Sequence, residues 1–493
     1  MHTLVLLDGH NIQRWHGWLV AALSAVRPGT VAVHAEIGPG PAAVRPAALR
    51  LLLAAERRIG RECASAIDPI SAASLEASVT TGCRPGGAFS VLLDLTGRRP
   101  RAEEGLLVIA PLFDGVPGEA TLWSALLDRR VPDLALAVAG QGNVRVAAPA
   151  IEHPHQIREA ADHVLSRLAE VLVRVAGGGL AALPQEPRAT PGTHIEDHPG
   201  SLDALRFAWS KVADKAGRLL ARRSGREPRW YVGWRMASEP AGPLTALAPL
   251  SAYTPLLDDG ARYYADPFVW THEGAHHVFV EEFPEATGRG IISQFEIRAD
   301  GAASTPRPVL ETGHHLSYPQ IFAHEGQIYM MPECAASGAL DVYRADPFPS
   351  RWVPAFRLLD AEVHDATLVA HEGRFYLLAS QRAFASSSWD SLHVYSADRL
   401  EGPWAPLPGN PVLIDRTASR SAGVLYRTEE ALWRPAQDCS RGYGSALTIA
   451  RVTRLDRDGF AQQPAGTLRL AGAVGGPHTV NRAGRLEVLD FLA

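Results

Sequence analysis

The chain has 493 residues, of which 46% are hydrophobic and 20% are charged, and this composition describes a globular protein of two or three domains rather than a disordered or fibrous one. Its 48 basic and 53 acidic side chains leave a net charge of −5, which argues against nucleic acid or an anionic membrane as the main partner. The four cysteines show no C-x-x-C spacing, which argues against a cysteine zinc site and suits a reducing compartment, so we expect a cytoplasmic protein.

The first predicted domain covers residues 1–176. Four apolar runs bounded by turn residues are typical of buried strands: HTLVLLDG, TVAVHAEI, FSVLLDLTG and GLLVIAPLF. Helical patterns lie between them, and the clearest covers 157–175, where apolar residues recur every three or four positions. This alternation predicts an α/β layer fold. The sequence shows neither a signal peptide nor an uninterrupted apolar run of about 18 residues, so we expect no membrane span.

Residues 177–227 are predicted to separate two domains. Three glycines, Gly177 to Gly179, end the preceding helix, and the Pro/Gly-rich stretch LPQEPRATPGTHIEDHPG follows as a linker. Residues 201–223 then predict an amphipathic helix capped by Ser201. We expect this helix to pack on a neighbouring domain, with contact between its basic end and a membrane surface as the alternative.

Residues 228–493 contain a repeat of roughly fifty residues, which is the period of a propeller blade. Each repeat centres on a hairpin turn and continues into further strand-like sequence; the five hairpins are ADPFVWTHEGAHHVFVEE, YPQIFAHEGQIYMMPE, HDATLVAHEGRFYLLAS, AGVLYRTEEALWRPAQ and GPHTVNRAGRLEVLDF. Five repeats of four strands predict an all-β five-bladed propeller. The last repeat supplies only two strands, so RWYVGWRM (229–236) is expected to complete it and close the ring.

Equivalent positions of the hairpins are expected to gather around one mouth of the propeller. Counting back from each turn selects Asp266, Tyr318, Asp365, Ala422 and Gly476, and counting forward selects Glu281, Glu333, Ser380, Gln437 and Phe491. Further polar side chains fall on the same face: Arg420, Arg434, Asp438, Tyr443 and His478. Clustered carboxylates with cationic and aromatic neighbours suit a polyhydroxylated or phosphorylated ligand. Two alternatives stay open: the carboxylates accept backbone N–H groups between blades, and the arginines serve as their counter-ions.

The runs HHLSYPQIFAHEGQIYMMPE, VHDATLVAHEG and WRPAQDCSRGYG resemble the propeller domain at the N-terminus of plant glucosamine inositolphosphorylceramide transferases. That domain is similar to the five-bladed propellers of arabinanase- and xylosidase-type glycosidases. The resemblance implies that Asp266 is the base or nucleophile, that Asp365 is the orienting carboxylate and that Glu333 is the general acid, with Glu281 as an alternative acid. It implies no cofactor and no metal ligands, although a calcium or sodium ion in the central channel stays open.

Residues 1–176 resemble a formyltransferase-type domain, on the evidence of LVLLDGHNIQRWHGWL, VLLDLTG and GEATLWSALLDRRVPDLALAV. Working formyltransferases need an Asn-x-His pair and an aspartate. Asp114 is present, but neither Asn11 nor Asn143 begins such a pair. We therefore expect a catalytically silent unit that offers a surface for a protein partner.

The sequence is consistent with three functions. The first is a carbohydrate-active enzyme, glycosidase-like or glycosyl-transferring, that uses the carboxylates at the propeller mouth on a carbohydrate or glycoconjugate. The second is a non-catalytic module that binds glycans or lipid headgroups, because propellers serve both roles. The third is formyl or one-carbon transfer by the N-terminal domain.

Overall fold

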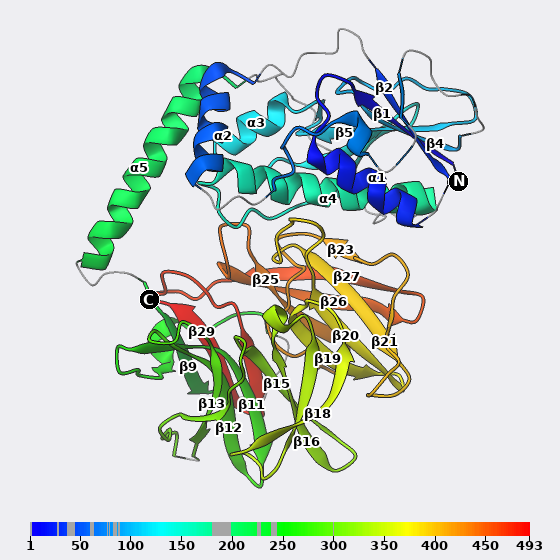
Figure 1. Ribbon diagram of the computed structural model, residues 1–493. Coiled ribbons are helices and arrows are strands. Elements are labelled where there is room, and N and C mark those ends of the chain that lie inside the picture. The colour runs from blue at the N-terminus through cyan, green and yellow to red at the C-terminus, as the bar shows by residue number, and fades with distance from the viewer. Residues whose placement is uncertain are drawn as a thin grey trace. The chain divides into compact units, whose positions relative to one another are not determined.

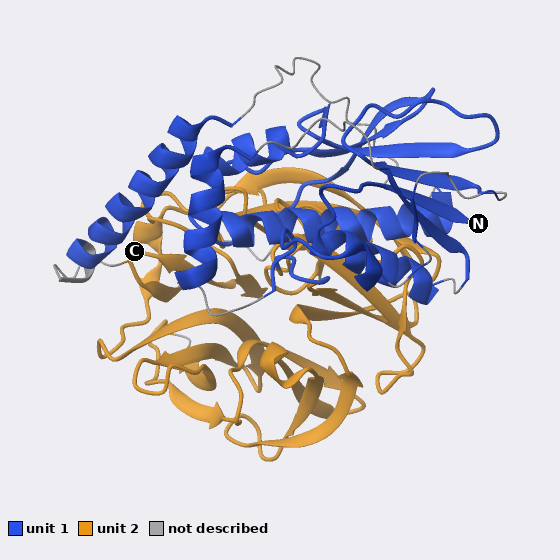
Figure 2. Cartoon of the chain, turned by 45° about the horizontal axis from the view of Figure 1, so that its top comes forward, with its two compact units in different colours: residues 1–226, 383–387 blue, residues 227–382, 388–493 orange. Residues whose placement is uncertain are grey.

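The computed structural model describes residues 2–26, 29–36, 45–59, 64–75, 77, 79–81, 86, 89–179, 199–223, 228–237, 244–298 and 300–493. The chain forms two compact units, which Figure 2 distinguishes by colour. Unit 1 contains Met1–Arg226 and Ala383–Ser387, and unit 2 contains Glu227–Arg382 and Ser388–Ala493. The helix expected between the domains is therefore part of unit 1. Most of the expected Pro/Gly-rich linker lies outside the described residues.

Unit 1 is built on one mixed sheet of eight strands in the order β3-β2-β1-β4-β5-β7-β8, with β6 paired to β5. The strands are β1 (Thr3–Asp8), β2 (Val31–Glu36), β3 (Val79–Thr81), β4 (Val91–Leu95), β5 (Leu107–Phe113), β6 (Val116–Pro117), β7 (Leu134–Val138) and β8 (Gly142–Ala147). The first five of these run parallel, and β7 and β8 are antiparallel additions. The four predicted strands are confirmed, and the order 3-2-1-4-5 is that of a doubly wound α/β fold.

The described residues of unit 1 form five α-helices: α1 (Arg14–Val26), α2 (Ala47–Ile59), α3 (Ala120–Leu127), α4 (Ile157–Gly178) and α5 (Ser201–Arg223). The helix α4 is almost entirely buried and packs against α1, as its predicted apolar periodicity requires. The helix α5 packs against α2 and α3. Among the described residues, no helix combines the length and the apolar character that crossing a bilayer requires.

Unit 2 is the predicted propeller of five sheets, whose strands carry the green to red colours of Figure 1. Blade 1 contains β11 (Arg262–His272), β12 (Ala275–Pro284), β13 (Ile291–Ile297) and β14 (Arg307–Leu310). Blade 2 contains β15 (Ser317–His324), β16 (Gln327–Glu333), β17 (Leu340–Ala345) and β18 (Trp352–Leu359). Blade 3 contains β19 (His364–His371), β20 (Arg374–Ser380), β21 (Ser391–Ala397), β22 (Ala405–Pro406) and β23 (Leu413–Ile414). Blade 4 contains β24 (Tyr426–Arg427), β25 (Leu432–Asp438), β26 (Ala446–Asp456) and β27 (Gly459–Leu468).

The fifth blade joins the two ends of the propeller sequence. Its strands are β28 (Val480–Ala483), β29 (Leu486–Leu492), β9 (Trp230–Met236) and β10 (Thr254–Pro255). The early strand β9 pairs antiparallel with the late strand β29 over its whole length. The predicted closure by residues 229–236 is thus confirmed, and the ring leaves only short outer edges.

Candidate active site

The inner strands of the first three blades carry the same irregularity at the predicted ring positions. The pairing register shifts between Ala265 and Phe268 in blade 1, and at the equivalent points of blades 2 and 3. The displaced residues have left-handed backbones and are Asp266 (φ 49°), Tyr318 (φ 46°) and Asp365 (φ 45°). A left-handed backbone costs a non-glycine residue roughly 1–2 kcal/mol, so contacts of the surrounding structure must hold these three residues in place.

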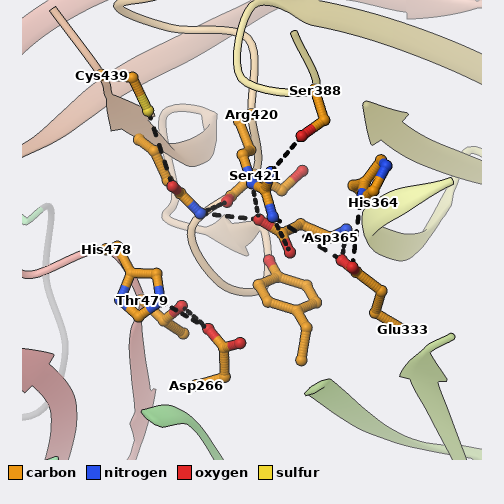
Figure 3. Close-up of polar contacts among 12 residues, drawn as sticks. Asp266, Glu333, His364, Asp365, Ser388, Arg420, Ser421, Cys439, His478 and Thr479 are labelled. Atoms are coloured by element: carbon orange, nitrogen blue, oxygen red, sulfur yellow. Dashed lines mark hydrogen bonds and ion pairs between the residues drawn. The ribbon is translucent and has the colours of Figure 1, made fainter. Parts of the chain in front are cut away.

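Asp266 belongs to a buried group that also contains His478, Thr479 and Asp490, which we call the Asp266 cluster. Figure 3 shows Asp266, His478 and Thr479 of this cluster. The Thr479 hydroxyl donates to Asp266 Oδ1 at 2.5 Å, and His478 Nε2 lies 3.4 Å from the same oxygen. The other imidazole nitrogen, Nδ1, lies 2.7 Å from Asp490 Oδ2. Asp490 in turn accepts the backbone N–H groups of His478, Thr479 and Asp266 at 2.9 to 3.0 Å. The imidazole is therefore held between two carboxylates.

The electrostatics of the Asp266 cluster favour a proton near neutral pH. Burial raises the pKa of Asp266 to about 6, with the charge of His478 opposing the rise and those of Asp490 and Glu281 adding to it. Burial alone lowers the pKa of His478, but the two flanking carboxylates outweigh it and raise that pKa to about 9. At pH 7 the cluster thus pairs an imidazolium with a carboxyl group that titrates close to the working pH.

A second buried group, the Asp365 cluster, contains Glu333, His364, Asp365, Arg420 and Gln437 (Figure 3). The Arg420 guanidinium donates to both oxygens of Asp365, at 2.5 Å from Nε and 3.2 Å from Nη2. The Gln437 amide donates to Asp365 Oδ2 at 2.8 Å. Glu333 accepts the Asp365 backbone N–H at 2.7 Å and lies 3.2 Å from His364 Nδ1. The carboxylate oxygens of Asp365 and Glu333 thus already have hydrogen-bond donors within unit 2.

The protonation of the two carboxyl groups in the Asp365 cluster depends on their hydrogen-bond and ion-pair partners. Burial raises the pKa of Glu333, but His364, Arg420 and the backbone N–H of Asp365 outweigh it, so that pKa lies well below its usual range. Burial also raises the pKa of Asp365, and the Arg420 guanidinium opposes that rise. All named partners of Asp365 are N–H donors, which is the environment of a carboxylate rather than of a carboxylic acid.

Glu281, the alternative acid of the sequence analysis, lies on β12 beside the first bulge, because it pairs with Ala265. Its Oε1 atom lies 3.2 Å from His315 Nε2, and this contact raises the pKa of His315. Within the described part of the chain, the other carboxylate oxygen of Glu281 has no hydrogen-bond partner. Glu281 is therefore a buried carboxyl group with one oxygen left for a ligand.

Partly exposed aromatic rings surround His478. The Trp230 ring centre lies 4.3 Å from that of His478, and the Tyr443 ring centre lies 5.1 Å from it. Tyr443 also stacks at a tilt on Trp389 at 5.4 Å and faces the Arg420 guanidinium at 5.2 Å. Rings of this kind beside carboxylates are suited to the apolar face of a sugar.

Three of the predicted site residues use their polar groups to hold other parts of the propeller in position, so these groups are not available to a ligand. The Tyr318 hydroxyl is buried between blades, where it accepts the Gly423 N–H at 2.6 Å. Arg434 is fully buried and donates to the backbone carbonyls of Ala418 and Ser419, so it holds the segment that carries Arg420. Asp438 accepts the Ser440 N–H in a turn, and its other oxygen lies 3.5 Å from Arg469 Nη2. For Arg434 and Asp438, the expectation of substrate contact is corrected, because their own partners occupy them.

The channel offers one candidate metal group, formed by Asp266, His478 and Asp490, whose ligand atoms lie within 4.8 Å of one another. Both Asp490 oxygens already accept backbone N–H groups, and His478 Nδ1 faces Asp490. Calcium requires six to eight oxygen ligands, which this set does not supply. The side chains of this cluster alone therefore do not supply a complete set of calcium ligands.

Sequence reasoning missed Asp490, Thr479, His364, His315 and Trp230. One signal for Asp490 was present, because an aspartate interrupts the apolar run LEVLDF of a predicted inner-blade strand. Thr479 and His364 lie next to selected positions, but they act through contacts between blades that no repeat alignment contains. His315 and Trp230 lie outside the positions that the repeat selects. In unit 1, Asp114 accepts the Asp133 N–H at 2.8 Å and pairs with Arg130 at 2.7 Å, so its carboxylate is already engaged in the turn.

Comparison with known proteins gives a family match for the propeller. Residues 245–474 match the family model described as glucosamine inositolphosphorylceramide transferase 1, N-terminal. The protein of that name from Arabidopsis thaliana is 29% identical over 206 residues, which cover 41% of this chain and 27% of the plant protein. The Oryza sativa subsp. japonica protein is 30% identical over 208 residues, covering 41% and 28%. The chain thus spans less than a third of these relatives, and the predicted resemblance is confirmed for the propeller.

Solved structures also resemble the chain, at low similarity. A family 117 glycoside hydrolase of Zobellia galactanivorans has a TM-score of 0.36 and 13% identity, and the match covers 53% of this chain and 90% of that one. The catalytic domain of a Coprinopsis cinerea GH62 α-L-arabinofuranosidase has a TM-score of 0.35 and 14% identity, covering 52% and 97%.

Proposed function

We propose that the propeller catalyses acid–base chemistry at a glycosidic bond of a carbohydrate or glycoconjugate, by hydrolysis or by transfer to an acceptor. The observation that carries the proposal is the Asp266 cluster: a buried aspartate with its pKa raised to about 6, set against an imidazolium and ringed by partly exposed aromatic side chains. Chemistry at a glycosidic bond needs one carboxyl group that donates a proton and a second that acts as a base or nucleophile. The name of the plant relatives points to a sugar-bearing lipid headgroup as the substrate class.

In this proposal Asp266 is the base or nucleophile, and Glu281 is the stronger candidate for the acid. Glu333 is the acid that the family resemblance implies, but its pKa is lowered and both of its oxygens contact neighbours. Glu281 keeps one oxygen available and lies beside the bulge that carries Asp266. Asp365 orients the site through Arg420, as the resemblance implies.

The test is a screen of aryl glycosides and sugar nucleotides with the wild type and Asp266→Asn. Removal of a general base lowers the rate about 100- to 10,000-fold, so the variant is expected to lose kcat by that factor while its circular dichroism is unchanged. Asp341→Asn, an exposed carboxylate of blade 2 paired with Arg357, is the matched control and is expected to retain full activity. Equal turnover by wild type and Asp266→Asn would exclude the proposed chemistry.

A binding module without turnover is the second candidate, because Asp365, Glu333 and Arg420 are satisfied by one another. In that case the aromatic rings and Glu281 bind a glycan or lipid headgroup. Saturable binding by Asp266→Asn with wild-type affinity, and no product from either protein, is the outcome this candidate predicts.

For unit 1 the formyltransferase resemblance stays a prediction. The engaged carboxylate of Asp114 supports a silent unit that offers a surface to a protein partner. Folate-cofactor binding by the full chain would instead support one-carbon transfer.

A further inference from the structure

The helix α5 is held to unit 1 by one face only. Ala204 and Phe207 are buried there, and α2 and α3 are the helices that α5 contacts. Lys211 Nζ pairs with Glu56 of α2 at 2.6 Å, and Asp214 pairs with Arg129 at 2.7 Å. These contacts fix the rotation of α5 about its axis, so its opposite face is turned away from unit 1.

That opposite face is apolar and exposed. Of the thirteen exposed large hydrophobic side chains in the described part of the protein, six lie on α5: Leu202, Leu205, Trp209, Val212, Leu219 and Leu220. The first four follow one another at steps of three and four residues, and Leu219 lies seven residues beyond Val212 with Leu220 beside it, so all six fall on one stripe of the helix. Trp209 is 75% exposed, and a helix face that contacts only water has no need of an exposed tryptophan. A continuous exposed stripe of this kind marks an interaction surface.

The charges around the stripe are all positive. Over residues 201–220, whose side chains the structure describes, the exposed charged residues of α5 are Arg206, Lys215 and Arg218, whereas Asp203 and Asp214 are partly exposed and pair with Arg206 and Arg129. The neighbouring helix α2 shows the same combination, with Leu51 and Ile59 exposed together with Arg50, Arg57 and Arg58. The whole chain carries a net charge of −5, so this apolar and basic surface is a local departure from its composition.

This pattern disfavours a second copy of the chain as the occupant. In a pair of helices, the residues that flank the apolar stripe face one another and need opposite charges. Here the described charged residues at those flanking positions are Arg206 and Lys215, so self-pairing would bring like charges together. An anionic lipid surface satisfies both properties, because it accepts apolar side chains into the acyl boundary and attracts Lys and Arg at the headgroups.

We propose that α5, with α2 beside it, binds the protein to an anionic lipid surface, with Leu205, Trp209 and Val212 entering the acyl boundary while Arg206 and Lys215 contact the headgroups. The 23 residues of α5 are within the usual length of helices that lie in a membrane interface. The proposal does not depend on the chemistry of the propeller.

The test is flotation of the full chain with vesicles of phosphatidylcholine alone or with part of it replaced by phosphatidylglycerol. Binding is expected only to the anionic vesicles. Leu205→Glu with Trp209→Glu is expected to abolish it, and Arg206→Gln and Lys215→Gln are expected to weaken it about fivefold each. Leu257→Glu, at an exposed leucine of unit 2, is the matched control and is expected to bind as the wild type does.

A second measurement reports insertion directly. Lipids brominated in their acyl chains should quench tryptophan fluorescence of the wild type more than that of Trp209→Phe, because the difference isolates Trp209. Equal binding to both kinds of vesicle, or equal loss in Leu257→Glu, would overturn the proposal. So would a concentration-dependent dimer that Leu205→Glu dissociates, or binding to an acidic helical protein without binding to vesicles. The altered side chains are exposed, so unchanged circular dichroism is the check that each variant folds.

Discussion

Asp266 and Glu333 each carry a buried carboxyl group, but the two groups have different neighbours. Burial raises the pKa of Asp266 to about 6, with Asp490 and Glu281 adding to the rise and the His478 imidazolium and the Thr479 hydroxyl opposing it. Glu333 has a backbone N–H, a histidine and a nearby guanidinium, and its pKa lies below its usual range. Burial raises the pKa of both carboxyl groups, so the difference between their pKa values comes from their partners.

The proposed acid can be identified from its dependence on the leaving group. A general acid matters little when the leaving group departs without a proton, so the variant lacking it keeps activity on aryl glycosides with acidic phenols. We expect Glu281→Gln to lose about 100-fold or more on an alkyl glycoside and to recover on a dinitrophenyl glycoside. Glu333→Gln is expected to lose similar activity on both substrates, because it disturbs Asp365. A leaving-group dependence in Glu333→Gln instead would return the acid role to Glu333.

At the scale of the element, the bulged inner strand is the unit that builds the site. Each bulge displaces one residue toward the blades beside it, and its side chain then bonds across blades: Asp266 to Thr479, Tyr318 to Gly423 and Asp365 to Arg420. The left-handed backbones are stabilised by these contacts. Gly423, whose φ is 127°, provides the corresponding close approach between blades 4 and 5.

Gly423→Ala tests this close approach. A Cβ atom at Gly423 would lie 2.1 Å from the Val480 carbonyl oxygen, and the backbone there is unfavourable for alanine. We expect a loss of about 3 kcal/mol or more in the free energy of unfolding. Gly326→Ala is the control, because φ is 76° there and no atom lies within 4 Å, so a loss of about 1 kcal/mol is expected. Urea denaturation measures both, and equal losses would contradict the packing argument.

Much of the propeller was predictable because the hairpin turns repeat. The HEG turns at Gly274, Gly326 and Gly373 set the register, and that register selected Asp266, Tyr318 and Asp365 correctly as equivalent positions. The roles of Arg434 and Asp438 were not predictable, since an inward-facing polar residue looks the same in sequence whether it meets a ligand or a backbone carbonyl. Contacts between blades join residues more than two hundred positions apart, as at Asp266 and Asp490, and one sequence contains no record of them.

At the scale of the whole propeller, the Asp266 cluster joins the first blade to the last. Its imidazolium has a pKa raised from 6.5 to about 9, so the folded state binds this proton more tightly than the unfolded chain does. The resulting stabilisation is fully present below pH 6.5 and is lost as pH rises through about 9. The raised pKa of Asp266 acts in the same direction between its ordinary value of 3.8 and about 6.

We therefore expect the free energy of unfolding to fall as the pH rises from 6.5 to 9, by about 3 kcal/mol at most from His478. The measurement is urea denaturation of the full chain at both pH values. His478→Gln has no proton to lose, so this part of the pH dependence should disappear. An unchanged pH dependence in His478→Gln would assign the effect to another group.

The order in which a ribosome makes the propeller gives its closing strand a further consequence. Strand β9 emerges first and must wait for β29, which is also the strand that carries Asp490. The strands within each of blades 1 to 4 can pair before β29 is synthesised. The imidazole of His478, however, has no carboxylate beside its Nδ1 atom until β29 supplies Asp490. The Asp266 cluster is therefore assembled only when the last strand of the ring has been made.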